Sequence, residues 1–183
     1  MARANETEPA DVVADAVDLL TRDHRLVEEL FAAFDAAAPQ QLDPLARRVC
    51  KMLRIHAQIE EEIFYPVARR AVQDDVLIDE AEREHQEAKQ AIARVESMTS
   101  DHAEFKRAVA DLADQIAKHV EEEEQQLFPQ MRSSGVNLVS MGLALAERRD
   151  TLLDTLGLHS DDEEGAANQR DVQQPPTRQD AGI

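Results

Sequence analysis

The sequence predicts an all-α protein, an up-down-up-down four-helix bundle followed by a short C-terminal fifth helix. Only five of its 183 residues are glycine, and Ala, Leu, Glu, Arg and Gln are abundant, a composition typical of helical proteins. Long segments carry apolar residues at spacings of three and four, which is the helical period. The breaks between these segments are short, and short connections favour antiparallel neighbours in a bundle.

Prolines mark the boundaries of the first two predicted helices. Apolar residues lie on one face over residues 11–38, and Pro39 ends that segment. Asp43 and Pro44 then have the character of an N-cap and a first helical residue, which predicts a second helix to about residue 71.

Polar residues mark the starts of the third and fourth predicted helices. Asp74 and Asp75 begin a third helix that extends to about residue 98. Ser100 or Asp101 caps a fourth helix to about residue 131, and Glu104 stands three residues after Asp101, at the capping-box spacing.

Gly135 separates this bundle from a shorter fifth helix over residues 136–156, whose apolar stretch either caps the bundle or forms a dimer contact. The polar segment from residue 158 to 183 lacks an apolar period, so we expect it to be disordered, as we do residues 1–10. The bundle domain is therefore predicted to span residues 11–157.

Charge and composition exclude several classes of function. The chain has 38 acidic and 20 basic residues, a net charge of −18, which argues against binding to nucleic acid or to an anionic membrane. No apolar run approaches the length of a membrane span, and the first ten residues lack the apolar core of a signal peptide. A single cysteine, Cys50, fits a reducing cytoplasm.

An internal repeat adds a specific functional prediction to the helical bundle. HAQIEEEIFYP begins at His56 and HVEEEEQQLFP begins at His119, an offset of 119 − 56 = 63 residues. Both contain His-x-x-x-Glu, a second Glu, an apolar–aromatic pair and a proline ten residues after the histidine. His24 and His85 lie 85 − 24 = 61 residues apart, and each directly follows an acidic residue. The chain therefore resembles two copies of one helix pair.

The repeated spacing predicts a metal site. Residues four apart lie on one helix face, so each His-x-x-x-Glu presents an imidazole and a carboxylate to a common point. Apolar residues flank these positions, and an inward carboxylate is costly unless a positive charge compensates it. Iron, manganese and zinc all accept such ligands. The candidate metal ligands are His24, His56, Glu60, His85, His119 and Glu123.

Over about residues 15–131 this pattern resembles the hemerythrin-like, His-His-Glu cation-binding domain family. The resemblance implies two iron ions inside the bundle, in an oxo- or hydroxo-bridged non-haem di-iron centre. By the same resemblance, His24, His56, His85 and His119 would be terminal ligands, and Glu60 and Glu123 would bridge the ions.

The match to oxygen-carrying hemerythrins is incomplete. Those proteins have a His-x-x-x-His pair on the third helix, whereas Ala81 and Lys89 stand four residues from His85. Their fourth-helix acid is Asp and is spaced differently. Water, the bridge or another side chain would fill the open positions, with Glu28, Glu82 and Tyr65 as candidates. More open positions favour redox chemistry over reversible O2 carriage.

The other conspicuous residues receive structural interpretations. His102 is expected at the surface, and His159, beside the tail, is expected to have no role. Cys50 is expected to be an inert, half-buried thiol. Two further expectations concern groups of residues. Pro66 and Pro129 should bend or end their helices, and Glu121, Glu122 and Glu124 should be solvated.

Three functions remain open from the sequence. The first is a protein that binds or reacts with O2, peroxide or nitric oxide, with a catalase-like activity or a role in oxidative stress. The second is a binding module whose stability depends on iron or oxygen occupancy and is sensed by a partner. The third is a structural bundle without metal. We expect a small diatomic molecule or peroxide as the partner, and a monomer or weak homodimer.

Overall fold

The computed structural model describes residues 14–72 and 74–156, so the two predicted disordered termini and His159 lie outside the described residues. Within those ranges the chain is helical and contains no strand. Its elements are α1 (Ala16–Asp35), the 3-10 turn η1 (Pro39–Gln41), α2 (Leu42–Ile59), the π-helical turn η2 (Glu60–Phe64), α3 (Tyr65–Ala71), α4 (Asp75–Glu96), α5 (Phe105–Glu122), the π-helical turn η3 (Glu123–Leu127), α6 (Phe128–Ser133) and α7 (Leu138–Thr155).

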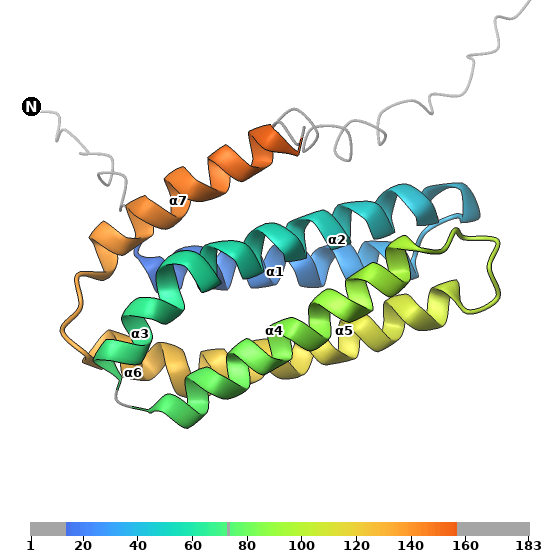
Figure 1. Cartoon of the computed structure of the whole chain (residues 1–183). Helices are drawn as coiled ribbons and strands as arrows, with labels where there is room; N and C mark the ends of the chain where they lie inside the picture. Colours follow the sequence, from blue (N-terminus) through green and yellow to red (C-terminus); the bar gives the residue numbers. More distant parts are fainter. Residues whose placement is uncertain (1–13, 73, 157–183) are drawn as a thin grey trace, which may run out of the picture.

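These elements form four antiparallel rods and one additional helix (Figure 1). Helix α2 continues through η2 into α3, and α5 continues through η3 into α6. With α1 and α4 these two composite rods make the bundle, which confirms the predicted fold class. Helix α7 packs along α1 and α2, so the predicted fifth helix covers one side of the bundle.

Side-chain caps begin three of the helices. The carboxylates of Asp15 and Asp74 accept hydrogen bonds from the backbone N–H groups of Asp18 and Leu77 at 2.9 and 3.1 Å. The Asn137 side chain does the same for α7. Each cap satisfies a backbone donor that the first turn of a helix leaves free.

The two other predicted caps were wrong, because other hydrogen bonds use those side chains. The Asp43 carboxylate accepts from the backbone N–H and hydroxyl of Ser100, at 2.9 and 2.5 Å, and α2 already begins at Leu42. Asp101 accepts from the Thr99 hydroxyl, and α5 begins only at Phe105. Asp43 therefore ties the α4–α5 connection to the start of α2.

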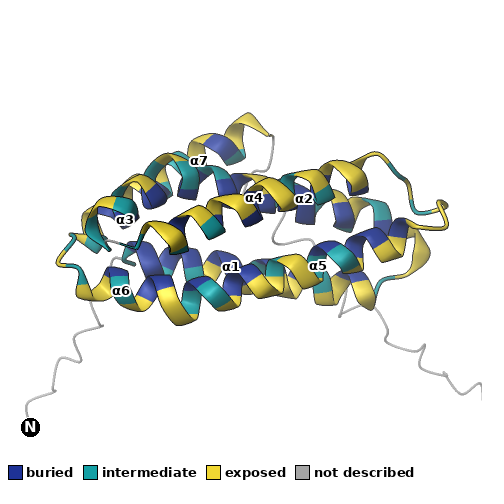
Figure 2. Ribbon diagram, turned by 60° about the horizontal axis from the view of Figure 1, so that its bottom comes forward, coloured by how far each residue is buried: buried dark blue, intermediate teal, exposed yellow. Residues whose placement is uncertain are grey.

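The interior consists of two apolar clusters with a polar layer between them. One cluster lies at the end of the bundle near α3, α6 and α7, and includes Leu20, Ile59, Phe64 and Leu127. The other lies at the opposite end and includes Leu30, Leu53, Ile92 and Leu112. Figure 2 shows the buried positions on the inward faces of the helices and the exposed positions outside.

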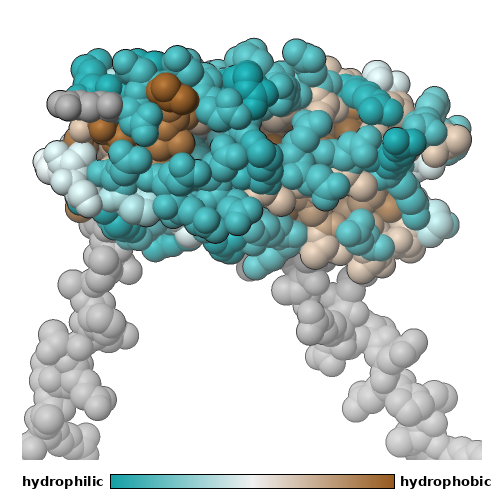
Figure 3. All heavy atoms as spheres, turned by 90° about the horizontal axis from the view of Figure 1, so that it is seen from below, coloured by the Kyte–Doolittle hydropathy of each residue, from teal (hydrophilic) through white to brown (hydrophobic). Residues whose placement is uncertain are grey.

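The outer surface is largely hydrophilic on the face drawn in Figure 3, with scattered apolar patches. None of the helices in residues 14–72 and 74–156 has a stretch long and apolar enough to cross a bilayer.

Candidate metal centre

Two π-helical turns stand at equivalent positions of the repeat and begin at the two repeated glutamates. In η2 the Tyr65 backbone N–H donates to the Glu60 carbonyl, and in η3 the Phe128 N–H donates to the Glu123 carbonyl. Each of these residues precedes a proline, which has no N–H for the regular bond to the residue four before it. Pro66 and Pro129 were expected to bend or end their helices. Neither proline ends its helical path, because each path forms one wider π turn and continues into α3 or α6.

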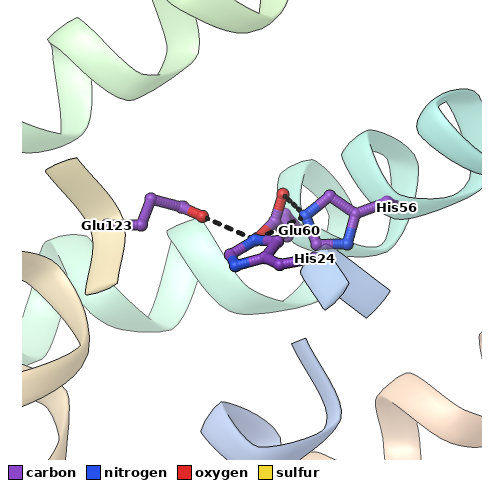
Figure 4. A group of neighbouring side chains, drawn as sticks. All are labelled: His24, His56, Glu60 and Glu123. Carbon is purple, nitrogen blue, oxygen red and sulfur yellow. Dashed lines mark hydrogen bonds and ion pairs between the residues drawn. The ribbon is translucent and has the colours of Figure 1, made fainter. Parts of the chain in front are cut away.

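All six predicted ligands meet in the polar layer and are buried. One group joins His24, His56, Glu60 and Glu123, and a second joins Glu60, His85 and His119. Within each group the possible ligand atoms lie within 4.8 Å of one another. Figure 4 shows the first group, in which side chains from α1, α2 and both π turns point toward one another.

The imidazoles form two pairs. The Nε2 atoms of His24 and His56 are 3.1 Å apart, and those of His85 and His119 are also 3.1 Å apart. Two nitrogens that bind one ion at about 2.1 Å, with an angle of roughly 95° between them, would be separated by about this distance. The spacing within each pair therefore fits a shared metal ion.

The two carboxylates lie between the imidazole pairs. Oε2 of Glu60 lies 3.1 Å from Nε2 of His56 and 3.3 Å from Nε2 of His85. Oε2 of Glu123 lies 3.4 Å from Nε2 of His24 and 3.5 Å from Nε2 of His119. Both side chains therefore face an imidazole of each pair, which is the position a bridging carboxylate needs.

These carboxylate oxygens lack ordinary hydrogen bonds. Both oxygens of Glu60 and Oε2 of Glu123 are buried without a hydrogen-bond partner, although imidazole nitrogens lie within ion-pair distance. A buried, unpartnered carboxylate is strongly unfavourable unless a cation compensates it. The four imidazoles and two carboxylates, with carboxylate oxygens that lack hydrogen-bond donors, thus fit a metal centre.

The outer imidazole nitrogens face a second layer of carboxylates. Nδ1 of His24 lies 2.9 Å from Glu124, Nδ1 of His85 lies 3.1 Å from Glu61, and Nδ1 of His119 lies 3.1 Å from Glu84. For His56 the facing carboxylate is that of Asp23, at 3.9 Å.

Ionised carboxylates only accept hydrogen bonds, so these contacts assign the ring proton to Nδ1 in three of the histidines. When one of these three imidazoles is neutral, its Nε2 lone pair points into the 3.1 Å gap between the rings of its pair. Two protons cannot both occupy that gap, whereas one metal ion can accept both lone pairs. Carboxylates placed behind metal-binding histidines commonly orient the rings in this way.

The pKa values of His85 and Glu61 are shifted by the charged groups around them. Burial opposes the protonation of His85, but the carboxylates of Glu60 and Glu61 outweigh burial and raise its pKa to about 10. Hydrogen bonding to His85 and Lys89 outweighs burial and lowers the pKa of Glu61 to about 2. The same negative charge that holds a proton on an imidazole would hold a metal ion in its place.

Each outer carboxylate also pairs with a cation. Arg25 pairs with Glu124, Lys89 with Glu61, and Lys118 with Glu84. Arg149 on α7 pairs with Asp23, with 2.7 Å between Nη1 and Oδ1. Each outer carboxylate therefore has a cationic partner outside the set of candidate metal ligands.

Tyr65 breaks the symmetry of the repeat, because Phe128 occupies the equivalent position. Its hydroxyl donates to Oε1 of Glu123 at 2.8 Å and lies 3.1 Å from Nε2 of His85. Burial, followed by the charge of Glu123, raises the pKa of the phenol. Of the three candidates for an additional ligand, Tyr65 is the one that reaches the site.

The other two candidates lie at the surface. Glu28 pairs with Arg25 and Glu82 pairs with Arg69, and both glutamates are about half exposed. Lys89, one of the two residues four positions from His85, binds Glu61. His102 is exposed, as expected.

Two expectations about single residues need correction. Glu124 was expected to be solvated, but it is only 24% exposed and faces Nδ1 of His24. Cys50 was expected to be half-buried, but it is 1% exposed, and burial raises its pKa to about 12.

A small cavity lies beside the four imidazoles. Its volume is about 20 Å³, close to the space that one water-sized molecule needs. Apolar side chains make up most of the rest of its wall: Val27, Leu53, Ala57, Ala88, Ile92, Ile116 and Val120. The site therefore has room for a very small ligand in apolar surroundings.

A four-helix bundle with paired imidazoles and carboxylates in its interior defines a metal-binding helical protein. The family model described as the hemerythrin HHE cation-binding domain matches residues 15–131. The chain belongs to this family and is a metal-binding, hemerythrin-like protein.

Two individual proteins are similar to the chain. A solved structure of a hemerythrin HHE cation-binding domain-containing protein from Mycobacterium kansasii has a TM-score of 0.68 and 18% identity, and the match covers 77% of this chain and 88% of that one. It supports the fold. A protein named DNA nickase from a Nostoc species is 30% identical over 118 residues, which are 64% of this chain. The match covers only 33% of that longer relative.

Proposed function

We propose that the protein holds a non-haem di-iron centre that binds or reacts with O2, peroxide or nitric oxide. One observation carries the proposal: two pairs of imidazoles meet in the interior, and the carboxylates of Glu60 and Glu123 lie between the two pairs. His24 and His56 would hold one ion, His85 and His119 the other, and the two glutamates would bridge them.

Iron bound by two imidazoles and a carboxylate supplies a change of valence and open positions for a small oxidant. The residues of the chain supply the rest. The outer carboxylates fix the imidazole protons on Nδ1 and keep Nε2 free for the metal. The apolar side chains that make up much of the cavity wall would limit the access of bulk water to the imidazoles.

The size and character of the cavity support the choice of ligand. A volume of about 20 Å³, close to what one water molecule needs, favours a diatomic molecule or peroxide over a larger organic substrate. A catalase-like version of the function would convert two molecules of H2O2 into two of water and one of O2, so that the oxidant and the reductant are the same compound.

Iron is proposed from membership of the family, since manganese and zinc accept the same donors. The test is to produce the protein with iron, measure iron and zinc per chain by elemental analysis, and titrate it anaerobically with O2, peroxide and nitric oxide. We expect two irons per chain and optical changes with at least one oxidant. A chain without iron, or an iron-loaded chain that is inert to all three, would contradict the proposal.

A second candidate is a binding module whose stability depends on metal occupancy. This candidate is favoured because each of the four rods of the bundle contributes at least one candidate metal ligand. A bound ion would link all four rods and stabilise the folded state by mass action. Limited proteolysis with and without iron tests this candidate. Identical digestion patterns would count against it.

We also propose that the protein is cytoplasmic and does not act on nucleic acid, despite the name of the Nostoc relative. The net charge of −18 would repel a phosphate backbone. The buried single cysteine suits a reducing compartment. A gel-shift titration at low salt tests the first point, and binding there would overturn it.

A further inference from the structure

The two halves of the repeat differ in the cation that supports one outer carboxylate. Lys118 comes directly before His119 and pairs with Glu84, which stands 3.1 Å from Nδ1 of that histidine. The equivalent residue before His56 is Ile55, which is 1% exposed and cannot pair with Asp23. The first half therefore lacks a cation of its own at this point.

Helix α7, which lies outside the repeat, supplies the missing charge. Arg149 donates through Nη1 to Oδ1 of Asp23 at 2.7 Å. The other oxygen of Asp23 faces Nδ1 of His56 at 3.9 Å, and that nitrogen is buried and without a hydrogen-bond partner. A series of side-chain contacts thus connects Arg149 on α7, through Asp23, to the metal-facing imidazole of His56.

Helix α7 packs closely against the backbone at the start of α1. A Cβ atom on Gly142 would lie 2.6 Å from the Ala14 carbonyl oxygen and 2.8 Å from the carbonyl carbon of Asp15, so only glycine fits against the start of α1. Gly142 stands seven residues, about two helical turns, before Arg149 and on the same face. Arg148 adds an ion pair to Glu62 at 2.6 Å.

We propose that Arg149 is a positioning residue that orients His56 through Asp23, so that one of the two metal positions depends on α7 and the other does not. The inference rests on the proposed metal centre. Loss of Arg149 should weaken the position formed by His24 and His56 and leave the position formed by His85 and His119 intact. The fifth helix is then part of the metal centre as well as a cover for the bundle.

The test measures cobalt(II) binding to the full chain by chelator competition, with the optical spectrum of the bound ion as a second readout. We expect two tight sites in the wild type. In Arg149→Met, one site should weaken by about tenfold, the lower end of the range found when the group directly behind a metal-binding histidine is removed, because Arg149 acts through Asp23. Arg149→Lys should restore much of the affinity. Arg148→Met is the matched control and should retain both sites, because its partner Glu62 faces solvent.

Double variants identify the weakened position. Arg149→Met should add nothing to the loss caused by His56→Ala, but should add its full effect to that of His119→Ala. Equal weakening of both sites, or an Arg148→Met variant that behaves like Arg149→Met, would show a purely structural role and overturn the inference.

Gly142→Ala gives an independent test that leaves Arg149 in place. Alanine favours helix over glycine, so α7 itself should form, but its start should be pushed away from α1. We expect weakening of the same single site, and two unchanged sites would overturn the docking argument. A wild type that binds no metal would refute the proposed function, whereas two equal sites in Arg149→Met would refute only this inference.

Discussion

His24 and His56 come from different helices, and their Nε2 atoms face each other at 3.1 Å in the protein interior. Replacing either imidazole by a methyl group removes one of the two nitrogens from that position. We expect His56→Ala to lower the metal content from two ions per chain to one, measured by elemental analysis after dialysis. His102→Ala is the control, because that side chain is exposed in the connection before α5. A His56→Ala protein that retains two ions would contradict the assignment.

Metal should also stabilise the fold through the two bridging carboxylates. An ion present at 100 times its Kd adds about 2.7 kcal/mol to the free energy of unfolding. For a domain of this size that corresponds to a rise in Tm of roughly 5–10 °C. We expect Glu60→Gln and Glu123→Gln to lose most of this rise, compared with the exposed-site control Glu28→Gln. Equal metal-induced shifts in all three variants would show that the glutamates do not hold the ion.

Removing the Tyr65 hydroxyl should destabilise the protein with little change in packing. The hydroxyl lies between Glu123 and His85, and its loss leaves a buried carboxylate oxygen without a donor. Such a loss costs about 1–3 kcal/mol. Urea unfolding of metal-free Tyr65→Phe should show this decrease. Thr151→Val, which removes an exposed hydroxyl, should change stability by less than about 0.5 kcal/mol. Equal stability of Tyr65→Phe and the wild type would contradict the hydrogen-bond role.

The Cys50 thiol should be unreactive in the folded protein. It is buried, and burial is the main cause that raises its pKa to about 12 from an ordinary value of 9.0. We expect negligible reaction with a disulfide reagent at pH 8 and complete reaction in guanidinium chloride. Fast stoichiometric labelling of the native chain would contradict the burial.

The raised pKa of Cys50 also has a consequence for stability. Between about pH 9 and 12 the unfolded chain releases the thiol proton and the folded chain keeps it, so this group makes the folded state less stable as pH rises. The expected measurement is a fall in the free energy of unfolding across this range that is smaller in Cys50→Ala.

The sequence predicts the helices and the six inward residues because both depend on spacing along a single helix. His56 and Glu60 share a face through a separation of four, and the repeat at His119 and Glu123 identifies them among many other acids. The start of α2 was misplaced because Asp43 bonds to Ser100, 57 residues further along the chain, which no local pattern reveals. The start of α5 was misplaced because Asp101 bonds to the nearby Thr99 instead of capping a helix.

Tyr65 and the outer carboxylates are harder to predict for a geometric reason. Nine residues of regular α-helix would turn Tyr65 about half a turn away from His56. The wider turn at η2 delays the following residues by about 100° and brings the ring inward. Glu61 and Glu124 each serve a histidine on a different rod, so only the tertiary fold reveals their role. The paired prolines were the signal that could have indicated the wider turns.

The exchange of carboxylates between the two halves has a consequence for the origin of the fold. Each half contains both imidazoles of one pair, but Glu60 faces His85 of the other half and Glu123 faces His24. A single ancestral helix hairpin could therefore have completed such a centre only by associating with a second copy of itself. Gene duplication and fusion would then have turned an intermolecular contact into an intramolecular one, and afterwards each copy was free to diverge, as Tyr65 and Phe128 have done.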